Sequence, residues 1–227
     1  MISGQVLRRS YAVGKQMFLE FDNDLTLRIH LGIYGKWQFH DSTQTPQVVG
    51  QVRARFFNAN LYADLRGPTV CEVIASGDVE GVLKRLGPDP LNPNPKSVES
   101  NRFIKKVLSS STEIGRLLMS QDVISGIGNV YRAELLFRHG IEPHTPGKAL
   151  TESQVQAIWD DSVKLLKVGV KTGFMITRDA LFAKHPSKEE RNWVYKREGK
   201  PCRNCQTEIK IELMAARKLY WCPACQS

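Results

Sequence analysis

The stretch GIGNVYRAELLFRHGI, residues 126–141, joins a glycine-rich turn to a helical pattern. Gly126 and Gly128 allow the backbone to turn tightly and to come close to a ligand. We expect Asn129 to be the N-cap of the helix, with backbone N–H groups just after it, where phosphate binds readily. A Gly-x-Gly-Asn segment alone is also compatible with an ordinary turn, so the phosphate site depends on the rest of the chain.

Helical patterns lie on both sides of this turn. Apolar residues between Phe103 and Leu118 predict two short amphipathic helices before it, and Val130–Phe137 predicts a third directly after it. Further on, residues 151–154 (TESQ) have the form of a capping box. The box begins a fourth helix, whose expected stripe is Val155, Ile158, Trp159, Ser162, Leu165, Leu166 and Gly169. Residues 171–195 are expected to be irregular, with short helical turns.

The first ninety residues favour β-strands. Gln16–Phe21 and Leu25–His30 are two short runs separated by a hairpin turn signal. Val48–Phe57 and Leu61–Leu65 form a second expected pair. Period two with one polar face predicts an antiparallel sheet with a solvated side. Residues 87–97 contain four prolines and are expected to be a linker.

Four cysteines near the C-terminus have the spacing of a metal site. Cys202 and Cys205 form one C-x2-C pair, Cys222 and Cys225 form another, and sixteen residues separate the pairs. Such pairs suit a structural, tetrahedral Zn²⁺ site on two knuckles of a β-hairpin, because four thiolates leave no position open for water. Two disulfides are the alternative, which a cytoplasmic chain disfavours. Cys71 is expected to be a small buried apolar residue.

The charge balance favours a polyanionic partner. The 227 residues include 32 Lys and Arg against 23 Asp and Glu, a net charge of +9. Residues 184–218 hold ten of the basic residues and five acidic ones, so about half of the net charge lies in this short segment. The sequence has neither an apolar stretch of the roughly 18 residues that a membrane helix needs nor a signal-peptide pattern, so we expect a cytoplasmic protein.

The turn-helix stretch resembles the helix–two-turn–helix signature of the formamidopyrimidine-DNA glycosylase and endonuclease VIII family, closest to the endonuclease VIII-like branch. Four other stretches resemble family segments in the same order, from a phosphate-contacting strand to a zinc finger. They are RRSYAVGKQMFLEF (8–21), LRIHLGIYGKW (27–37), RLGPDPL (85–91) and VYKREGKPCRNCQTEIKIELMAARKLYWCPACQ (194–226). Five matches in register are difficult to obtain by chance.

The resemblance implies an α+β multi-domain protein. Its expected parts are an incomplete N-terminal antiparallel β-sandwich (1–86), the linker (87–97), a helical helix–two-turn–helix DNA-binding domain (98–195) and a zinc-finger β-hairpin (196–227). The implied partner is double-stranded DNA with oxidised or abasic sites. The implied state is a monomer in the cytoplasm, associated with the bacterial nucleoid.

Three residues match family positions that contact phosphate. Lys15 matches the lysine that contacts the phosphate beside the lesion, and Asn129 matches the asparagine that clamps the backbone. Arg217 matches the arginine at the tip of the zinc hairpin, whose guanidinium grips phosphate with parallel donors. The alternative for Lys15 and Arg217 is a solvated side chain without a role.

Three more residues match positions near the flipped nucleotide. Ile33 and Tyr34 match the wedge that supports the base stack after a nucleotide has been extruded. Ordinary core packing at a strand end is the alternative for this pair. Arg66 lies in an expected loop that the family uses near the lesion.

The resemblance implies a DNA glycosylase with AP lyase activity that removes oxidised bases. An amine attacks the sugar C1′, and the resulting Schiff base loses the base and then undergoes elimination at the phosphates. The family nucleophile is an N-terminal proline followed by a glutamate, whereas this sequence begins Met1-Ile2-Ser3-Gly4. We therefore expect that the segment with this pair is absent from the 227 residues, and that this chain forms no borohydride-trapped complex with abasic DNA.

Three hypotheses remain open at this point. The native protein has an earlier start and is an active enzyme, or the chain is a catalytically silent relative that binds damaged DNA. A third hypothesis is a zinc-ribbon protein that binds DNA without chemistry, which explains the charge and the cysteines but not the matching stretches. Neither the lesion range nor the number of elimination steps has a signal in the sequence.

Overall fold

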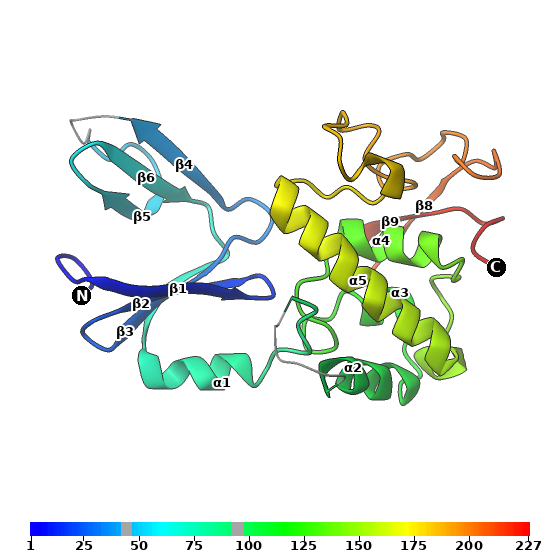
Figure 1. Ribbon diagram of the computed structural model, residues 1–227, viewed down its shortest axis with the longest axis horizontal. Coiled ribbons are helices and arrows are strands. Elements are labelled where there is room, and N and C mark those ends of the chain that lie inside the picture. Colours follow the sequence, from blue (N-terminus) through cyan, green and yellow to red (C-terminus); the bar gives the residue numbers. More distant parts are fainter. Residues whose placement is uncertain (42–46, 92–97) are drawn as a thin grey trace. The chain divides into compact units, whose positions relative to one another are not determined.

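The computed structural model describes residues 1–41, 47–91 and 98–227. The chain divides into two compact units, residues 1–85 and residues 86–227 (Figure 1). Residues 92–97 of the expected linker lie outside the described residues. None of the helices in the described part of the chain has both the length and the apolar character that crossing a membrane requires.

The first unit contains two antiparallel sheets, in the orders β1-β2-β3-β7 and β4-β6-β5. The strands are β1 Leu7–Val13, β2 Gln16–Phe21, β3 Leu25–His30, β4 Lys36–Asp41, β5 Val52–Phe57, β6 Leu61–Arg66 and β7 Val70–Ala75. A 3-10 turn, η1 (Ser76–Asp78), and helix α1 (Val79–Leu83) follow β7. The bounds expected for β2 and β3 are confirmed. Strand β5 begins later than expected because Gly50 has a left-handed backbone, with φ of 73°.

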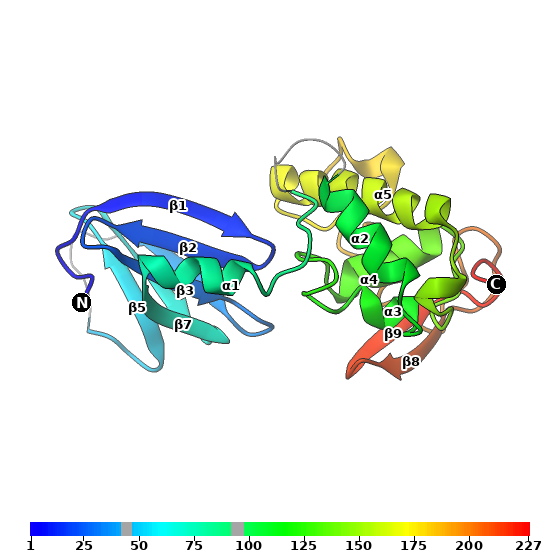
Figure 2. The ribbon, with the colours of Figure 1, turned by 90° about the horizontal axis from the view of Figure 1, so that it is seen from below.

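Both faces of the β1-β2-β3-β7 sheet make core contacts. On one face, Leu19 packs in a core cluster with Leu65 of the other sheet. On the opposite face, Phe18 packs against Val79 of α1 (Figure 2). The expectation of a solvated side holds only in part for this sheet: α1 covers the face around Phe18, whereas the ion pair of Arg28 with the half-exposed Glu72 lies on the same face. Cys71 is only partly buried, since it lies on β7 at the edge of the sheet.

The second unit combines helices with a two-stranded hairpin. Its elements are α2 Val98–Leu108, α3 Ile114–Leu117, α4 Asn129–Arg138, η2 Gly147–Ala149, α5 Glu152–Thr172, η3 Asp179–Leu181, β8 Lys210–Met214 and β9 Arg217–Trp221. The core cluster includes Phe103 and Ile158, which are fully buried. The capping box of α5 is confirmed, because Thr151 and Gln154 exchange hydrogen bonds between side chain and backbone in both directions.

Residues 87–90 are buried in the second unit. The Gly87 N–H donates to the Gln121 carbonyl oxygen at 2.8 Å, and the Ser125 N–H donates to the Pro88 carbonyl oxygen at 2.9 Å. The expectation of a linker is therefore wrong for these four residues. They pack against the helical part of the chain instead of spanning a gap.

Candidate nucleic-acid interface

Helix α4 begins at Asn129, and its N-cap is Gly128 rather than Asn129 as expected. The Asn129 carboxamide faces the hairpin instead: its Nδ2 donates to the Lys218 carbonyl oxygen at 2.9 Å, and its Oδ1 accepts from Arg132. The backbone N–H of Arg132 donates to the Gly128 carbonyl oxygen at 2.8 Å. The amides of residues 129–131 precede this first intrahelical bond, an arrangement that favours a bound anion.

Arg132 lies in the first turn of α4 and is fully buried. Its Nη1 donates to the Met214 carbonyl oxygen at 3.0 Å, at the end of β8. Its Nη2 donates to Asn129 Oδ1 and, at 3.5 Å, to the Lys218 carbonyl oxygen in β9. One guanidinium therefore joins the start of α4 to both strands of the hairpin, which lies beside this helix (Figure 1).

Glu134 is a second fully buried ionisable residue of α4. Its carboxylate accepts from the backbone N–H groups of residues 193–195 at 2.7–2.8 Å, and from the hydroxyl of Thr177. These bonds anchor the segment that leads into the cysteine region. Sequence reasoning assigned no role to Arg132 or Glu134, although two charged residues inside an apolar helix are a signal of buried polar partners.

The hairpin turn consists of Ala215 and Ala216, whose φ angles are 52° and 55°. Such a turn matches the twist of the strands, but it holds two alanines in the left-handed region at on the order of 1 kcal/mol each. Arg217 follows the turn and is exposed. Among the described residues, no hydrogen bond or ion pair engages its guanidinium, so it is available to an outside ligand.

The four cysteines lie together beside the hairpin, with all sulfur atoms within 4.8 Å of one another. The Sγ atoms of Cys202 and Cys225 are 3.9 Å apart, and those of Cys205 and Cys222 are 3.4 Å apart. A disulfide requires about 2.05 Å. Four thiolates at about 2.3 Å from a tetrahedral metal ion are about 3.8 Å from one another. The geometry therefore fits a bound metal ion with four sulfur ligands.

Lys15 is exposed in the two-residue turn between β1 and β2, next to Gly14. His30 at the end of β3 is half-buried, and desolvation together with the charges of Lys15 and Arg28 lowers its pKa. The imidazole near Lys15 is consequently neutral at pH 7. Desolvation of the Lys15 amine lowers its pKa to about 8, so the side chain is still mostly a cation at pH 7.

Ile33 and Tyr34 lie at the tip of the loop between β3 and β4, and they are 62% and 84% exposed. The alternative of core packing at a strand end therefore does not hold. Gly32 adopts φ of 66°, and a Cβ there would lie 1.8 Å from Thr69 Oγ1. A side chain at position 32 would therefore strain the loop that carries Ile33 and Tyr34.

Arg66 is the last residue of β6, not a loop residue as expected. Its Nη1 donates to the Val49 carbonyl oxygen at 2.7 Å, and its Nη2 pairs with Asp64 Oδ2 at 3.2 Å. The same carboxylate accepts two hydrogen bonds from Arg55. The Arg66 guanidinium is therefore engaged inside the first unit.

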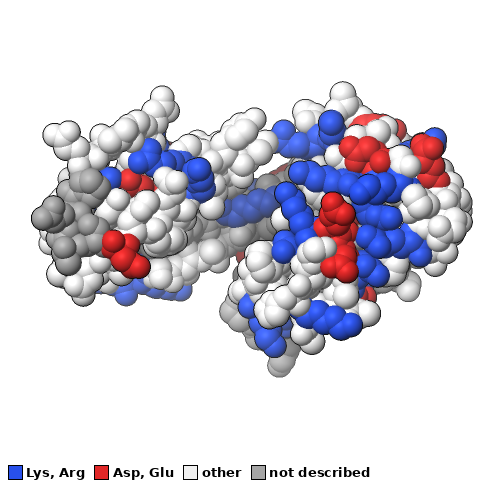
Figure 3. Space-filling view, turned by 90° about the horizontal axis from the view of Figure 1, so that it is seen from above, with Lys and Arg blue, Asp and Glu red and all other residues white. Residues whose placement is uncertain are grey.

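A basic hollow of about 460 Å³ borders the first turn of α4. It is lined by Val130, by Met175 and by a basic segment that includes Lys188, Arg191, Lys196, Arg197 and Lys200. Figure 3 shows Lys and Arg side chains gathered on one face of the second unit. The positive charge near the start of α4 therefore extends beyond the hairpin tip, as phosphate binding requires.

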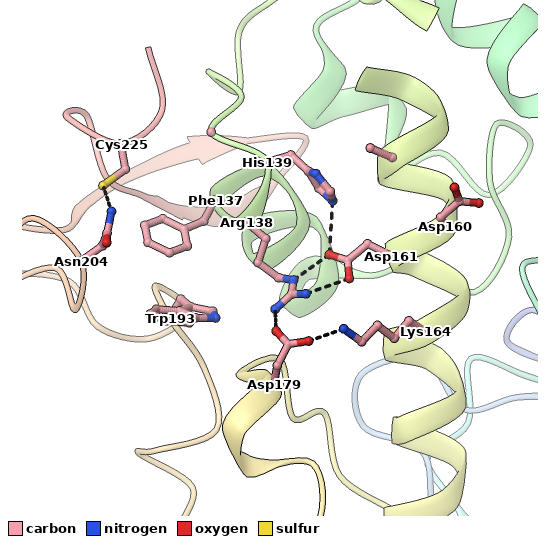
Figure 4. A pocket seen from close by; sticks show the side chains of 12 residues that line it. Phe137, Arg138, His139, Asp160, Asp161, Lys164, Asp179, Trp193, Asn204 and Cys225 are labelled. Carbon is pink, nitrogen blue, oxygen red and sulfur yellow. Dashed lines mark hydrogen bonds and ion pairs between the residues drawn. The ribbon is translucent and has the colours of Figure 1, made fainter. Parts of the chain in front are cut away.

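A larger cavity, of about 780 Å³, lies at the opposite end of α4 (Figure 4). Arg138 donates two hydrogen bonds to Asp161, at 2.6 and 2.9 Å, and a third to Asp179. This third bond is the main reason that the pKa of Asp179 falls to about 2. Lys164 also pairs with Asp179, and His139 lies 3.2 Å from Asp161. Because these charges neutralise one another, we assign the network to fastening α4 against α5 and η3.

Two family models match the chain. The formamidopyrimidine-DNA glycosylase N-terminal domain matches residues 1–71, and the formamidopyrimidine-DNA glycosylase H2TH domain matches residues 86–180. A solved structure of formamidopyrimidine-DNA glycosylase from Lactococcus lactis, non-covalently bound to DNA with an AP site, has the same fold with a TM-score of 0.81 at 23% identity. The match covers 99% of this chain and 82% of that one.

Curated relatives align along the whole chain. Endonuclease 8 1 of Mycobacterium tuberculosis is 43% identical over 235 residues, which cover 100% of this chain and 86% of that protein. Endonuclease 8 of Escherichia coli K12 is 28% identical over 227 residues, which cover 98% of this chain and 84% of that protein. This chain therefore belongs to the family of formamidopyrimidine-DNA glycosylases and endonuclease 8.

Proposed function

We propose that this protein recognises double-stranded DNA at oxidised or abasic sites and acts in base-excision repair as a DNA glycosylase with AP lyase activity. The observation that carries the proposal is the hydrogen bond from Asn129 to the Lys218 carbonyl oxygen. This bond holds the N-terminus of α4 next to the basic hairpin, and a helix N-terminus favours an anion. The names of the relatives support this function, as does the abasic DNA bound to the structural neighbour.

Each exposed site residue has a role in this proposal. Asn129, the first-turn amides of α4 and Arg217 hold phosphates of the DNA backbone, and Lys15 contacts the phosphate beside the lesion. Ile33 and Tyr34 fill the space that the flipped nucleotide leaves, because an apolar side chain beside an aromatic ring supports the remaining stack. Arg66 has no direct role here, since its guanidinium is already bound.

We propose that the cysteines hold Zn²⁺ and that its role is structural. Four thiolates complete a tetrahedral site, so the ion supplies folding free energy and takes no part in the reaction. Metal analysis of the purified protein is expected to find one zinc ion per chain. A folded, DNA-binding protein with a different metal in these four ligands would contradict the assignment.

The recognition step is tested by binding. Fluorescence anisotropy with two short duplexes of the same sequence, one intact and one with a stable abasic-site analogue, gives the two affinities. We expect clear preference for the abasic duplex, because a missing base removes the cost of unpairing and unstacking. Equal affinity for both duplexes would exclude damage recognition and would favour a zinc-ribbon protein that binds DNA without selectivity.

The chemical step is tested separately. Borohydride reduction traps the iminium that forms between an amine of a lyase and an abasic aldehyde. A trapped adduct on the 227-residue chain would identify a lyase, and mass spectrometry would locate its amine. Selective binding without an adduct would instead identify a relative that binds damaged DNA and does not cleave it.

A further inference from the structure

Arg132 brings a positive charge into the interior of the second unit, and among the described residues no carboxylate pairs with it directly. The residue is fully buried, and its acceptors are neutral oxygens of Gly115, Met214, Lys218 and Asn129. Its Nε is also buried and has no hydrogen-bond partner among the described residues. None of the ion pairs within that part of the chain includes this guanidinium.

The charge is unfavourable in the free protein. Desolvation lowers the pKa of Arg132 to about 10; the charge of Glu212 opposes this shift, and the smaller effects of Arg116 and Arg217 add to it. At neutral pH the guanidinium is nevertheless protonated. A buried ion without a counter-ion is costly. An anion that binds close to Arg132 is therefore stabilised more than one at an exposed arginine.

An anion bound at the start of α4 can accept hydrogen bonds from further donors. The helix has ten residues, and its first-turn amides precede the bond from the Arg132 N–H to Gly128. Arg217 is close enough to influence the pKa of Arg132 and is exposed beyond the hairpin turn. Helix N-terminus, buried cation and exposed guanidinium together favour a phosphate group.

Arg132 also determines which atom of Asn129 faces a ligand. The Oδ1 atom accepts from Arg132, and one Nδ2 proton goes to the Lys218 carbonyl oxygen, so the second Nδ2 proton remains for a ligand. Without the guanidinium, only the bond to the Lys218 carbonyl oxygen holds this orientation of the carboxamide. A carboxamide in the opposite orientation would present Oδ1, an acceptor that repels phosphate oxygens.

We propose that Arg132 is a positioning residue of a phosphate clamp, defined as the first turn of α4, the Asn129 side chain and Arg217. Arg132 fixes the Asn129 carboxamide with its donor outward, holds the hairpin tip against α4, and has its charge balanced when a DNA phosphodiester binds. This inference rests on the proposed DNA-binding function.

The test is a double-mutant cycle between Arg132→Met and Asn129→Ala. Affinity is measured for an intact and an abasic duplex, together with zinc content and thermal unfolding of each variant. If Arg132 acts through Asn129, each single substitution lowers affinity by about tenfold and the double substitution lowers it little further. Arg102→Met is the charge-matched control, because it removes an exposed arginine of α2 that pairs with Glu99.

A variant that leaves Arg132 in place provides a second readout. In Asn129→Asp, the new carboxylate pairs with the buried guanidinium and faces the phosphate with negative charge. We expect its affinity for both duplexes to fall by more than about tenfold. Its melting temperature is expected to stay above that of Asn129→Ala, because the new ion pair offsets the lost bond to the Lys218 carbonyl oxygen. A melting temperature no higher than that of Asn129→Ala would contradict an unbalanced charge at Arg132.

Two results would overturn the proposal: additive losses in the cycle, or wild-type affinity of a zinc-loaded Arg132→Met. Arg132→Lys keeps the charge but cannot bond Asn129 and Met214 together, so we expect an intermediate loss that is again non-additive with Asn129→Ala. The intact duplex separates the two proposals. Equal affinity of the wild type for both duplexes would refute the proposed function but not the role of Arg132. The coupling between Arg132 and Asn129 would still be measured.

Discussion

Arg217 ends in a planar guanidinium at the tip of the hairpin, which can offer two parallel N–H donors to one phosphate. Arg217→Lys keeps the charge and loses this geometry. We expect its affinity for an abasic duplex to fall by about fivefold, with zinc content unchanged. The neighbouring Lys218→Arg, which keeps a cation and leaves the backbone carbonyl in place, is the matched control. Unchanged affinity of Arg217→Lys would mean that the hairpin has another task.

Glu134 is an acceptor for three backbone N–H groups and one hydroxyl in the interior of the second unit. Glu134→Gln replaces one carboxylate oxygen by an NH2 group that faces these donors. We expect the free energy of unfolding to fall by about 2–4 kcal/mol. Denaturant titration measures this change, and Glu198→Gln, at an exposed position, is the control. A loss no larger than that of the control would contradict the anchoring role.

At the scale of residues, the sequence predicts those parts of the site whose partners lie close together in the chain. The cysteine cluster is predictable because two C-x2-C pairs bring their own ligands together. The role of Arg132 is not, because its partners at Met214 and Lys218 are more than 80 residues away in the chain. For the same reason the expected N-cap role of Asn129 is wrong: Arg132 and the hairpin compete for its side chain.

At the scale of elements, the strands and helices that a short sequence pattern predicts agree with the structure. Strands β2 and β3 and the capping box of α5 depend on neighbours within a few residues. The second face of the first sheet and the buried prolines at 87–90 were not predictable, because α1 and the helical part of the chain cover them from a distance. Tertiary packing decides these points, and it has no local pattern.

An element-level pH effect follows from His144, which joins α3 to the hairpin. Its Nδ1 lies 2.9 Å from Glu113 Oε1, and its Nε2 lies 2.8 Å from Glu212 Oε1. Hydrogen bonding to Glu113, and also to Glu212, raises the pKa of His144. The bond between His144 and Glu113 in turn lowers the pKa of Glu113. The histidine contributes stability that is complete below about pH 6.5 and is lost as pH rises through its higher folded pKa. The Glu113 contribution is present above about pH 4.5 and is lost as pH falls.

The contribution of His144 is therefore expected to be largest between about pH 4.5 and 6.5. Comparing the wild type with His144→Gln at about pH 6 and about pH 8 isolates it, because pH-dependent metal binding affects both proteins alike. We expect the substitution to reduce the free energy of unfolding more at the lower pH. His185→Gln, at an exposed histidine, is the control. An equal effect of His144→Gln at both pH values would contradict the ion-pair interpretation.

At the scale of the whole molecule, two units with separate cores predict separate responses to metal removal. Chelation removes the metal ion that the four cysteines are proposed to bind. Because Cys202 and Cys222 belong to the hairpin core, removal of the ion is expected to loosen that core. Hydrogen exchange is expected to show lost protection in residues 202–225 and then in α4, while β2 and β3 keep theirs. Loss of protection in β2 and β3 at the same time would show that the units do not respond independently.

The hydrogen-bond partners of α4 lie far along the sequence, and this determines the order in which the parts of the protein can fold during synthesis. Lys218 follows its partner Asn129, Met214 follows Arg132 and Trp193 follows Glu134 by 59 to 89 residues. At ribosomal rates of about 5–20 residues per second, this corresponds to a delay of roughly 3 to 18 seconds. A ten-residue helix with unpaired charges is not stable alone during that interval. The first unit can therefore be complete on the ribosome, whereas α4 has all of these partners only after Lys218 has been synthesised.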